Sequence, residues 1–122
     1  MSTIKVDTLQ TTGGAGLYPA RVWLTYNASA SSILGSGNMS SVTDNGVGIY
    51  TANFSNSLSD NTYSTQQTSD GPVASHHVHG YLSQSNETLG TYSTSAVQLA
   101  YFRDENSGNR ADPVKSCLVV VR

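Results

Sequence analysis

Apolar and polar residues alternate along several segments of the chain, which is typical of β-strands that bury one face of a sheet. In residues 21–27, Val22, Leu24 and Tyr26 fall on one face, whereas Trp23 falls on the other. Such segments recur at intervals of about ten residues, with Gly, Asn, Asp and Pro between them. We therefore predict strands at 21–27, 39–43, 49–54, 62–68, 76–83, 88–93, 96–103 and 114–122.

The clearest turn lies between the second and third of these segments. Residues 44–48 contain an Asn-Gly pair, which favours the positive φ angles of a tight hairpin turn. We therefore expect 39–43 and 49–54 to pair with each other, with Asn-Gly at the centre of the turn. Loops are predicted at 35–37, 69–72 and 106–109, where Gly, Ser, Asn and Asp gather.

The last strand differs from the others, because residues 117–121 are apolar at consecutive positions. Both faces of such a strand need covering, so we expect it either in the centre of the sandwich or at a contact between subunits. Cys117 is the single cysteine, which excludes a disulfide within the chain. In this apolar run we expect it to be a buried and inert thiol.

Composition favours a fold built from strands. Ser and Thr account for 32 of the 122 residues and charged residues for 11%, with only two Glu and two Lys. A helical bundle needs more charged helix formers on its solvent faces, so the composition argues against one. We predict an all-β fold, an antiparallel β-sandwich of about seven or eight short strands.

The first 17 residues differ in pattern from the rest of the chain, so we divide the chain into 1–17 and 18–122. Residues 3–9 alternate like one short strand, and a linker rich in Gly and Thr comes after them. A lone strand cannot bury a face by itself, so it needs a partner in its own domain or on another chain. We predict that 1–17 is a stem or attachment segment that acts through Ile4, Val6 and Leu9.

Charge and hydropathy narrow the range of partners. The net charge is −2 and no run of Lys or Arg occurs, so we expect neither nucleic acid nor an anionic membrane as a partner. No apolar stretch approaches the roughly 18 residues that span a bilayer. The first residues also lack the pattern of a signal peptide, which favours a protein that is made in the cytoplasm or leaves it without such a signal.

Several short motifs succeed one another in a distinctive order. They are Ser2-Thr3-Ile4-Lys5-Val6-Asp7-Thr8-Leu9-Gln10, Tyr18-Pro19-Ala20-Arg21, Ser36-Gly37-Asn38 and Val42-Thr43-Asp44-Asn45-Gly46. This series resembles small virion structural proteins and tail-fibre domains of tailed bacteriophages, especially phages of marine bacteria. The resemblance covers 2–54 well, thins out through 60–100 and returns where Asp112-Pro113 leads into the last strand.

The resemblance implies a homotrimeric tail fibre or spike of a virion. Its N-terminal piece would attach to other virion proteins, and its distal β-domain would meet the host cell surface, for example a surface glycan. Two alternatives stay open: a head or tail decoration protein without a receptor, and a free lectin-like module. Because 60–95 is where the chain departs most from this group, binding specificity does not carry over.

Candidate ligand contacts lie in this divergent part. Tyrosine rings can stack on sugars, and amide or carboxylate groups beside them can bind hydroxyls. The residues that meet this description are Tyr63, Gln66, Asp70, Tyr81, Gln84 and Tyr92. Plain packing of the tyrosines is the alternative. Trp23, Tyr50, Phe54 and Phe102 are predicted to belong to the core or to an interface.

One cluster could bind a metal. His77 and His79 fall on one face of a strand, and three such pairs on the axis of a trimer would offer six nitrogens to a divalent ion. The alternative is a polar strand face, and otherwise no cofactor is expected. We expect no enzyme, because the chain has no Gly-x-Ser-x-Gly motif and its acidic residues show no catalytic spacing.

Overall fold

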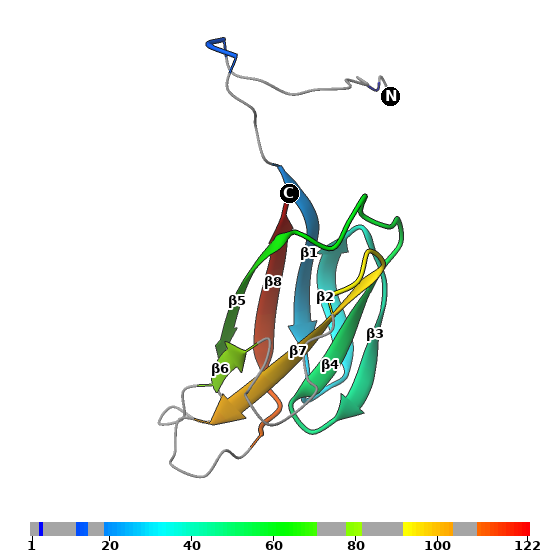
Figure 1. Ribbon diagram of the computed structural model, residues 1–122. Coiled ribbons are helices and arrows are strands. Elements are labelled where there is room, and N and C mark those ends of the chain that lie inside the picture. The colour runs from blue at the N-terminus through cyan, green and yellow to red at the C-terminus, as the bar shows by residue number, and fades with distance from the viewer. Residues whose placement is uncertain (1–2, 4–11, 15–18, 71–77, 82–91, 104–109) are drawn as a thin grey trace.

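The computed structural model describes residues 3, 12–14, 19–70, 78–81, 92–103 and 110–122 (Figure 1). They form eight strands: β1 (Ala20–Asn27), β2 (Ser32–Gly37), β3 (Met39–Gly46), β4 (Ile49–Phe54), β5 (Ser64–Asp70), β6 (Val78–Tyr81), β7 (Ala96–Arg103) and β8 (Lys115–Val121). This part of the chain contains no helix that is long and apolar enough to cross a membrane.

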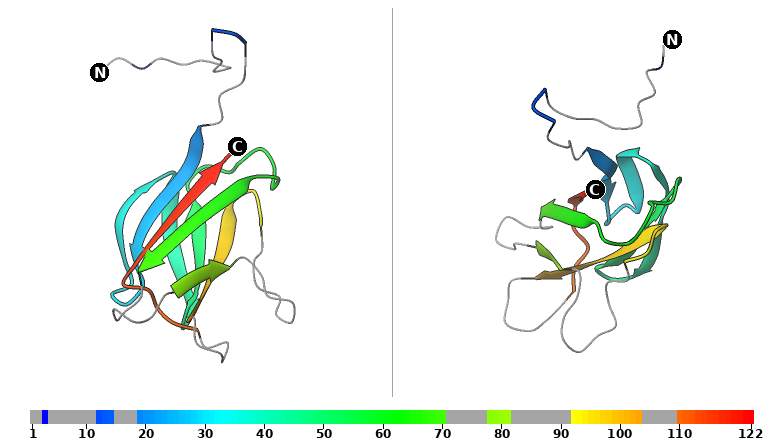
Figure 2. Two further views of the ribbon diagram at one scale, coloured as in Figure 1. Left: turned by 90° about the vertical axis from the view of Figure 1, so that its left-hand side faces the viewer. Right: turned by 45° about the horizontal axis from the view of Figure 1, so that its top comes forward.

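The strands form two antiparallel sheets of four strands each. One sheet has the order β2-β1-β8-β5 and the other has the order β3-β4-β7-β6. Figure 2 shows the two sheets as two layers that lie face to face. The predicted all-β, antiparallel, sandwich-like architecture is confirmed.

The core lies between the two layers and consists of the alternating apolar residues of β1, β4, β7 and β8. Its fully or almost fully buried members include Val22, Leu24, Tyr26, Tyr50, Ala52, Phe54, Val97, Leu99, Tyr101, Leu118 and Val120. The face predicted for residues 21–27 is therefore confirmed, and residues 49–54 and 96–103 alternate in the same way. Alternation works here because each strand has one face on the core and the other directed outward.

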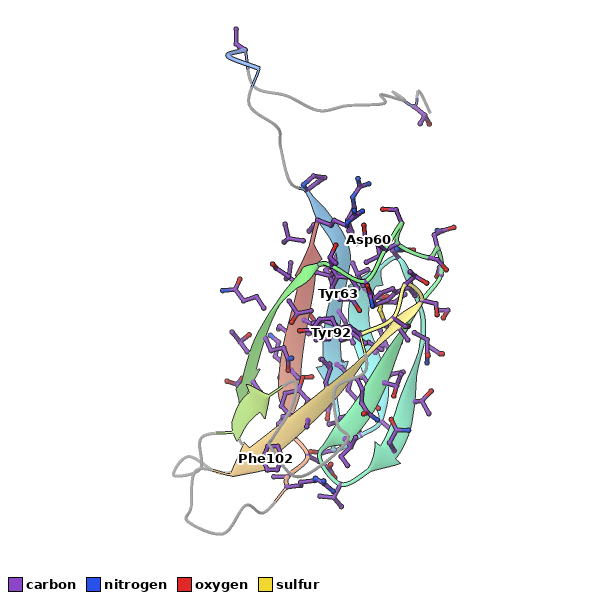
Figure 3. The ribbon with its side chains drawn as sticks, in the orientation of Figure 1. Asp60, Tyr63, Tyr92 and Phe102 are labelled. Carbon is purple, nitrogen blue, oxygen red and sulfur yellow. The ribbon has the colours of Figure 1, made fainter. Side chains whose placement is uncertain are left out.

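The four aromatic residues expected in the core or an interface divide into two groups. Tyr50, Phe54 and Phe102 are buried. Phe102 lies on the outward face of its strand, where the Arg110 guanidinium stands 6.0 Å from the ring centroid (Figure 3). Trp23 is not part of the core, because 46% of it is exposed.

The hairpin of β3 and β4 is confirmed, but its turn is placed further along the chain than predicted. Gly46 pairs with Ile49, so Val47 and Gly48 form the loop. A side chain at Gly48, whose φ is +68°, would lie 2.7 Å from the backbone oxygen of Tyr101. Only glycine satisfies both the positive φ and this close approach, so it fixes the position of the turn.

Strand β2 contradicts the loop predicted at 35–37. Ser, Gly and two adjacent apolar residues give β2 no alternation, so periodicity could not reveal it. It pairs with β1 through a register that shifts between Thr25 and Tyr26. The structure also places β5 slightly later than the predicted 62–68, at Ser64–Asp70.

The last strand, β8, lies in the centre of a sheet between β1 and β5, whereas the prediction was that both of its faces are covered. Its inward residues Leu118 and Val120 are buried. Its outward residues Cys117, Val119 and Val121 are half-buried, so the outward face is only partly covered by the described chain.

Other predicted elements fall wholly or largely outside the described residues. The stem strand at 3–9 and its residues Ile4, Val6 and Leu9 belong to this group, because only residues 3 and 12–14 of the first 17 are described. Of the strand predicted at 88–93, Tyr92 forms an isolated bridge with Val97. Strand β6 is the described part of the strand predicted at 76–83.

Candidate functional site

Three exposed apolar residues lie along the β2 edge of the first sheet. They are Trp23, Ile33 and Leu34, whose exposed fractions are 46%, 41% and 58%, and we call them the β2 edge patch. Trp23 is on the outward face with Gly37, Ile33 pairs with the buried Tyr26, and Leu34 is the unpaired residue of a bulge, so the three residues border the edge of the sheet and do not share one face. Only five large apolar residues are exposed in the described part of the chain, and three of them are here. Such clustering is typical of a surface that contacts another molecule, because single exposed apolar residues are normal but grouped ones are not.

The indole ring of Trp23 lies against two glycines of β2. Trp23 pairs with Gly37 across the strands, and Gly35 pairs with Thr25 on the same side. A side chain at Gly37 would begin 2.2 Å from Nε1 of the indole, and one at Gly35 would begin 3.3 Å from Cζ3. The ring therefore covers the backbone of β2, where a side chain would block it, and still presents almost half of its surface to solvent.

The backbone of β2 is itself open to a partner. Among the strands that the structure describes, β2 is an edge strand with β1 as its only neighbour, and it contains no charged residue and no proline. Charges and prolines are the usual means by which proteins protect an edge against pairing with other chains. The other edge of this sheet, β5, ends in the exposed carboxylate of Asp70. A bulge at Leu34 is the one protective feature of β2.

The structure brings together two of the predicted ligand residues, Tyr63 and Tyr92. Their ring centroids are 5.1 Å apart, and Tyr63 is 7% exposed (Figure 3). The Tyr63 hydroxyl donates to the backbone oxygen of Ser93 at 3.1 Å, and burial raises the pKa of Tyr63 to about 12. Tyr92 is half-buried, and its hydroxyl lies 3.2 Å from that of Thr65. Both rings take part in packing, which was the alternative to ligand contact for these tyrosines.

The remaining predicted ligand residues are dispersed. Gln66 and Asp70 are exposed on the outward face of β5. The backbone of Tyr81 belongs to β6, but its side chain lies outside the description, as does Gln84 altogether. That these residues contact a ligand stays a prediction.

The predicted metal site also falls largely outside the described residues. His77 is not described, and His79 is described only through its backbone, which pairs with Phe102. Within the part of the chain that the structure describes, no three His, Cys, Asp or Glu side chains gather to hold an ion. A metal at His77 and His79 stays a prediction.

A polar cluster that sequence reasoning missed joins the hairpin turn to the segment before β8. The Asp112 carboxylate accepts hydrogen bonds from the Tyr50 hydroxyl and, at 2.7 Å, from the Gly48 amide. Burial and the hydrogen bond to Asp112 raise the pKa of Tyr50 well above its usual value. An Asp-Pro pair in the sequence suggests only a turn or a cap, whereas the cluster indicates that Asp112 ties two loops together.

Comparisons with known proteins give no match: no family model, no curated protein and no solved structure is significantly similar to this chain. Function is therefore inferred from the exposed surfaces of the fold and from the resemblance of the sequence motifs.

Proposed function

We propose that the chain is a structural subunit of a bacteriophage virion, a homotrimeric tail fibre or spike that attaches the particle to the host cell surface. The observation that carries the oligomeric part is the β2 edge patch, where Ile33 and Leu34 of the uncharged edge strand and Trp23 of the neighbouring β1 are exposed. Burial of such a patch against another copy removes apolar surface from water and pairs open backbone groups. The virion context comes from the resemblance of the sequence motifs.

The half-buried outward face of β8 supports the same proposal. Val119 is the cross-strand partner of Trp23, so apolar surface continues from the edge patch toward the centre of the sheet. The outward positions of β8, which are Cys117, Val119 and Val121, carry no charge. Subunit contacts are typically depleted in Lys and Glu, so an uncharged face of this kind is suited to such a contact.

Both ends of the β-domain lie at one end of the sandwich, which suits a tethered element. Ala20, where β1 begins, pairs with Val121, where β8 ends (Figure 1). The hairpin turn at 46–48 lies at the opposite end. An attachment segment at 1–17 that acts through Ile4, Val6 and Leu9 would leave that opposite end free to meet the host.

The proposed partners are two further copies of the chain, other virion proteins and a host surface glycan. The proposal includes no catalytic activity, and a divalent ion at His77 and His79 on the trimer axis is its only candidate cofactor. A decoration protein without a receptor and a free lectin-like module remain the alternatives.

Immunogold labelling of intact virions, combined with host adsorption in the presence of the purified chain, tests the proposal. We expect label on tail fibres or spikes and a dose-dependent block of adsorption. Label on the head or the tail without any block would support the decoration protein. Virions that carry no label would reject a virion role and favour the lectin-like module.

A further inference from the structure

A cavity of about 260 Å³ lies at the end of the sandwich where β1 begins and β8 ends. Three segments that are distant in the sequence line it: Arg21 at the start of β1, Ser57, Leu58 and Ser59 in the connection from β4 to β5, and Arg122 after β8. Two guanidinium groups and two hydroxyls thus gather around a space that is smaller than the roughly 300–1,000 Å³ of sites for drug-sized ligands.

A β-bulge brings Arg21 to the cavity. Ala20 pairs with Val121 and Val22 pairs with Val120, so Arg21 is an extra residue between the two pairs. Bulges of this kind redirect a side chain away from the regular alternation of the strand. The exposed Arg21 makes no hydrogen bond or ion pair within the described part of the chain, so its forked set of donors is available.

The positive charge of the second guanidinium, that of Arg122, is offset by a neighbouring carboxylate. Arg122 donates to the Ser59 hydroxyl and to the Asp60 carboxylate. Asp60 also accepts from the Thr62 amide at 2.8 Å and from the Thr62 hydroxyl at 2.6 Å, and these bonds lower the pKa of Asp60. Asp60 therefore stays ionised and offsets Arg122, which leaves the cavity with the single positive charge of Arg21.

We propose that this cavity binds one carboxylate of an acidic peptide segment in a partner protein. A single free guanidinium matches one negative charge, and its parallel N–H groups match the two oxygens of a carboxylate. A phosphate group carries about −1.5 to −2 charges and would be only partly neutralised here. The hydroxyls of Ser57 and Ser59 supply further donors beside Arg21.

The position of the cavity favours a peptide over a saccharide. Strand β1 begins at this end, so a protein that holds the predicted attachment segment at 1–17 would border the cavity. The inference rests on the proposed function, because it assumes that the chain is anchored to another protein at this end. It adds that anchoring uses an acidic contact to Arg21 besides the apolar residues of 1–17.

The test follows the backbone amide signals of Ser57 and Ser59, and in the unaltered protein also the Arg21 Nε–Hε signal, by NMR. Full-length protein is titrated with N-acetylglutamate α-methylamide, whose only carboxylate is that of the side chain. We expect a saturable shift at millimolar concentrations and none with N-acetylglutamine α-methylamide, which has the same shape without a carboxylate. Arg21→Gln should weaken binding about tenfold, because a charged hydrogen-bonding partner is lost. Lys115→Gln is the matched control, since Lys115 is an exposed cation at the far end of β8, and it should leave binding unchanged.

Three results would overturn the inference. The absence of a saturable shift removes the site, tighter binding of glucuronate assigns it to acidic saccharides, and equal binding of sulfate shows attraction of any anion. These results are distinct from failure of the proposed function. Virions without label combined with binding of N-acetylglutamate α-methylamide at Arg21 would reject the virion role. Labelled virions without such binding would reject the acidic contact alone.

Discussion

The indole of Trp23 lies so close over Gly37 that no side chain fits between them. A Cβ at Gly37 would be 2.2 Å from Nε1 and 2.6 Å from Cδ1 of the ring. At Gly35 the nearest ring atom would be 3.3 Å away, which is tight but not prohibitive. The glycines that suggested a loop are therefore the surface on which an exposed tryptophan rests.

Gly37→Ala should displace the Trp23 ring from β2 and expose it further. Overpacking of this kind costs about 1–3 kcal/mol, and we expect the lower end because the ring can swing outward into solvent. The chain has one tryptophan, so its fluorescence reports the change directly, as a red shift of emission. Gly35→Ala is the graded control and should shift the emission much less. Equal emission from both variants would show that the ring does not rest on Gly37.

Tyr50 and Tyr101 are neighbours in the core whose hydroxyls differ in their contribution to stability. The Tyr50 hydroxyl bonds the Asp112 carboxylate, whereas the Tyr101 hydroxyl is buried without a hydrogen-bond partner in the described chain. Tyr50→Phe should lower the free energy of unfolding by about 1.5–3 kcal/mol, and Tyr101→Phe should leave it unchanged or raise it by about 1 kcal/mol. Urea denaturation of both variants measures this. The reverse order would be incompatible with the described cluster.

Alkaline pH should destabilise the fold through its buried tyrosines. Burial raises the pKa of Tyr63 and of Tyr101 to about 12 and that of Tyr50 further, against about 10 in the unfolded chain. A raised pKa in the folded state gives a contribution that is complete below about pH 10 and is lost as the pH rises above it. Unfolding monitored by urea should therefore show a falling midpoint above about pH 10. A midpoint that stays level there would mean that these hydroxyls ionise as freely as in the unfolded chain.

The β2 edge patch should be the surface through which copies associate. Leu34→Ser removes its most exposed apolar side chain and should weaken association while leaving the core intact, because 58% of Leu34 is exposed. Val47→Ser is the matched control, since Val47 is also apolar and exposed but lies at the hairpin turn. Sedimentation velocity compares the two variants. If Val47→Ser dissociates the protein and Leu34→Ser does not, the contact lies at the hairpin end instead.

Alternation predicted the strands that pack on the core, because burial of one face imposes a period of two on residues such as Val22 and Leu24. It could not predict β2, whose place depends on the contact of Trp23 with Gly35 and Gly37. The hairpin was predicted from Asn-Gly, but a packing contact between Gly48 and Tyr101 decided where it turns.

The candidate sites were harder to predict, because they depend on which distant segments meet. The sequence around Tyr63 and Tyr92 does not show whether their rings are packed or exposed. Only the structure shows that the two rings are in contact. Arg21 and Arg122 are almost a full chain apart in the sequence, and the pairing of β1 with β8 brings them to one cavity. No local motif carries that information.

The central claim is that the chain works as a homotrimer, and its mass in solution tests this most directly. Multi-angle light scattering of the full-length protein at micromolar concentration should give about 39 kDa, three times the 12.9 kDa of one chain. A mass equal to that of a single 12.9 kDa chain under the same conditions would contradict the account.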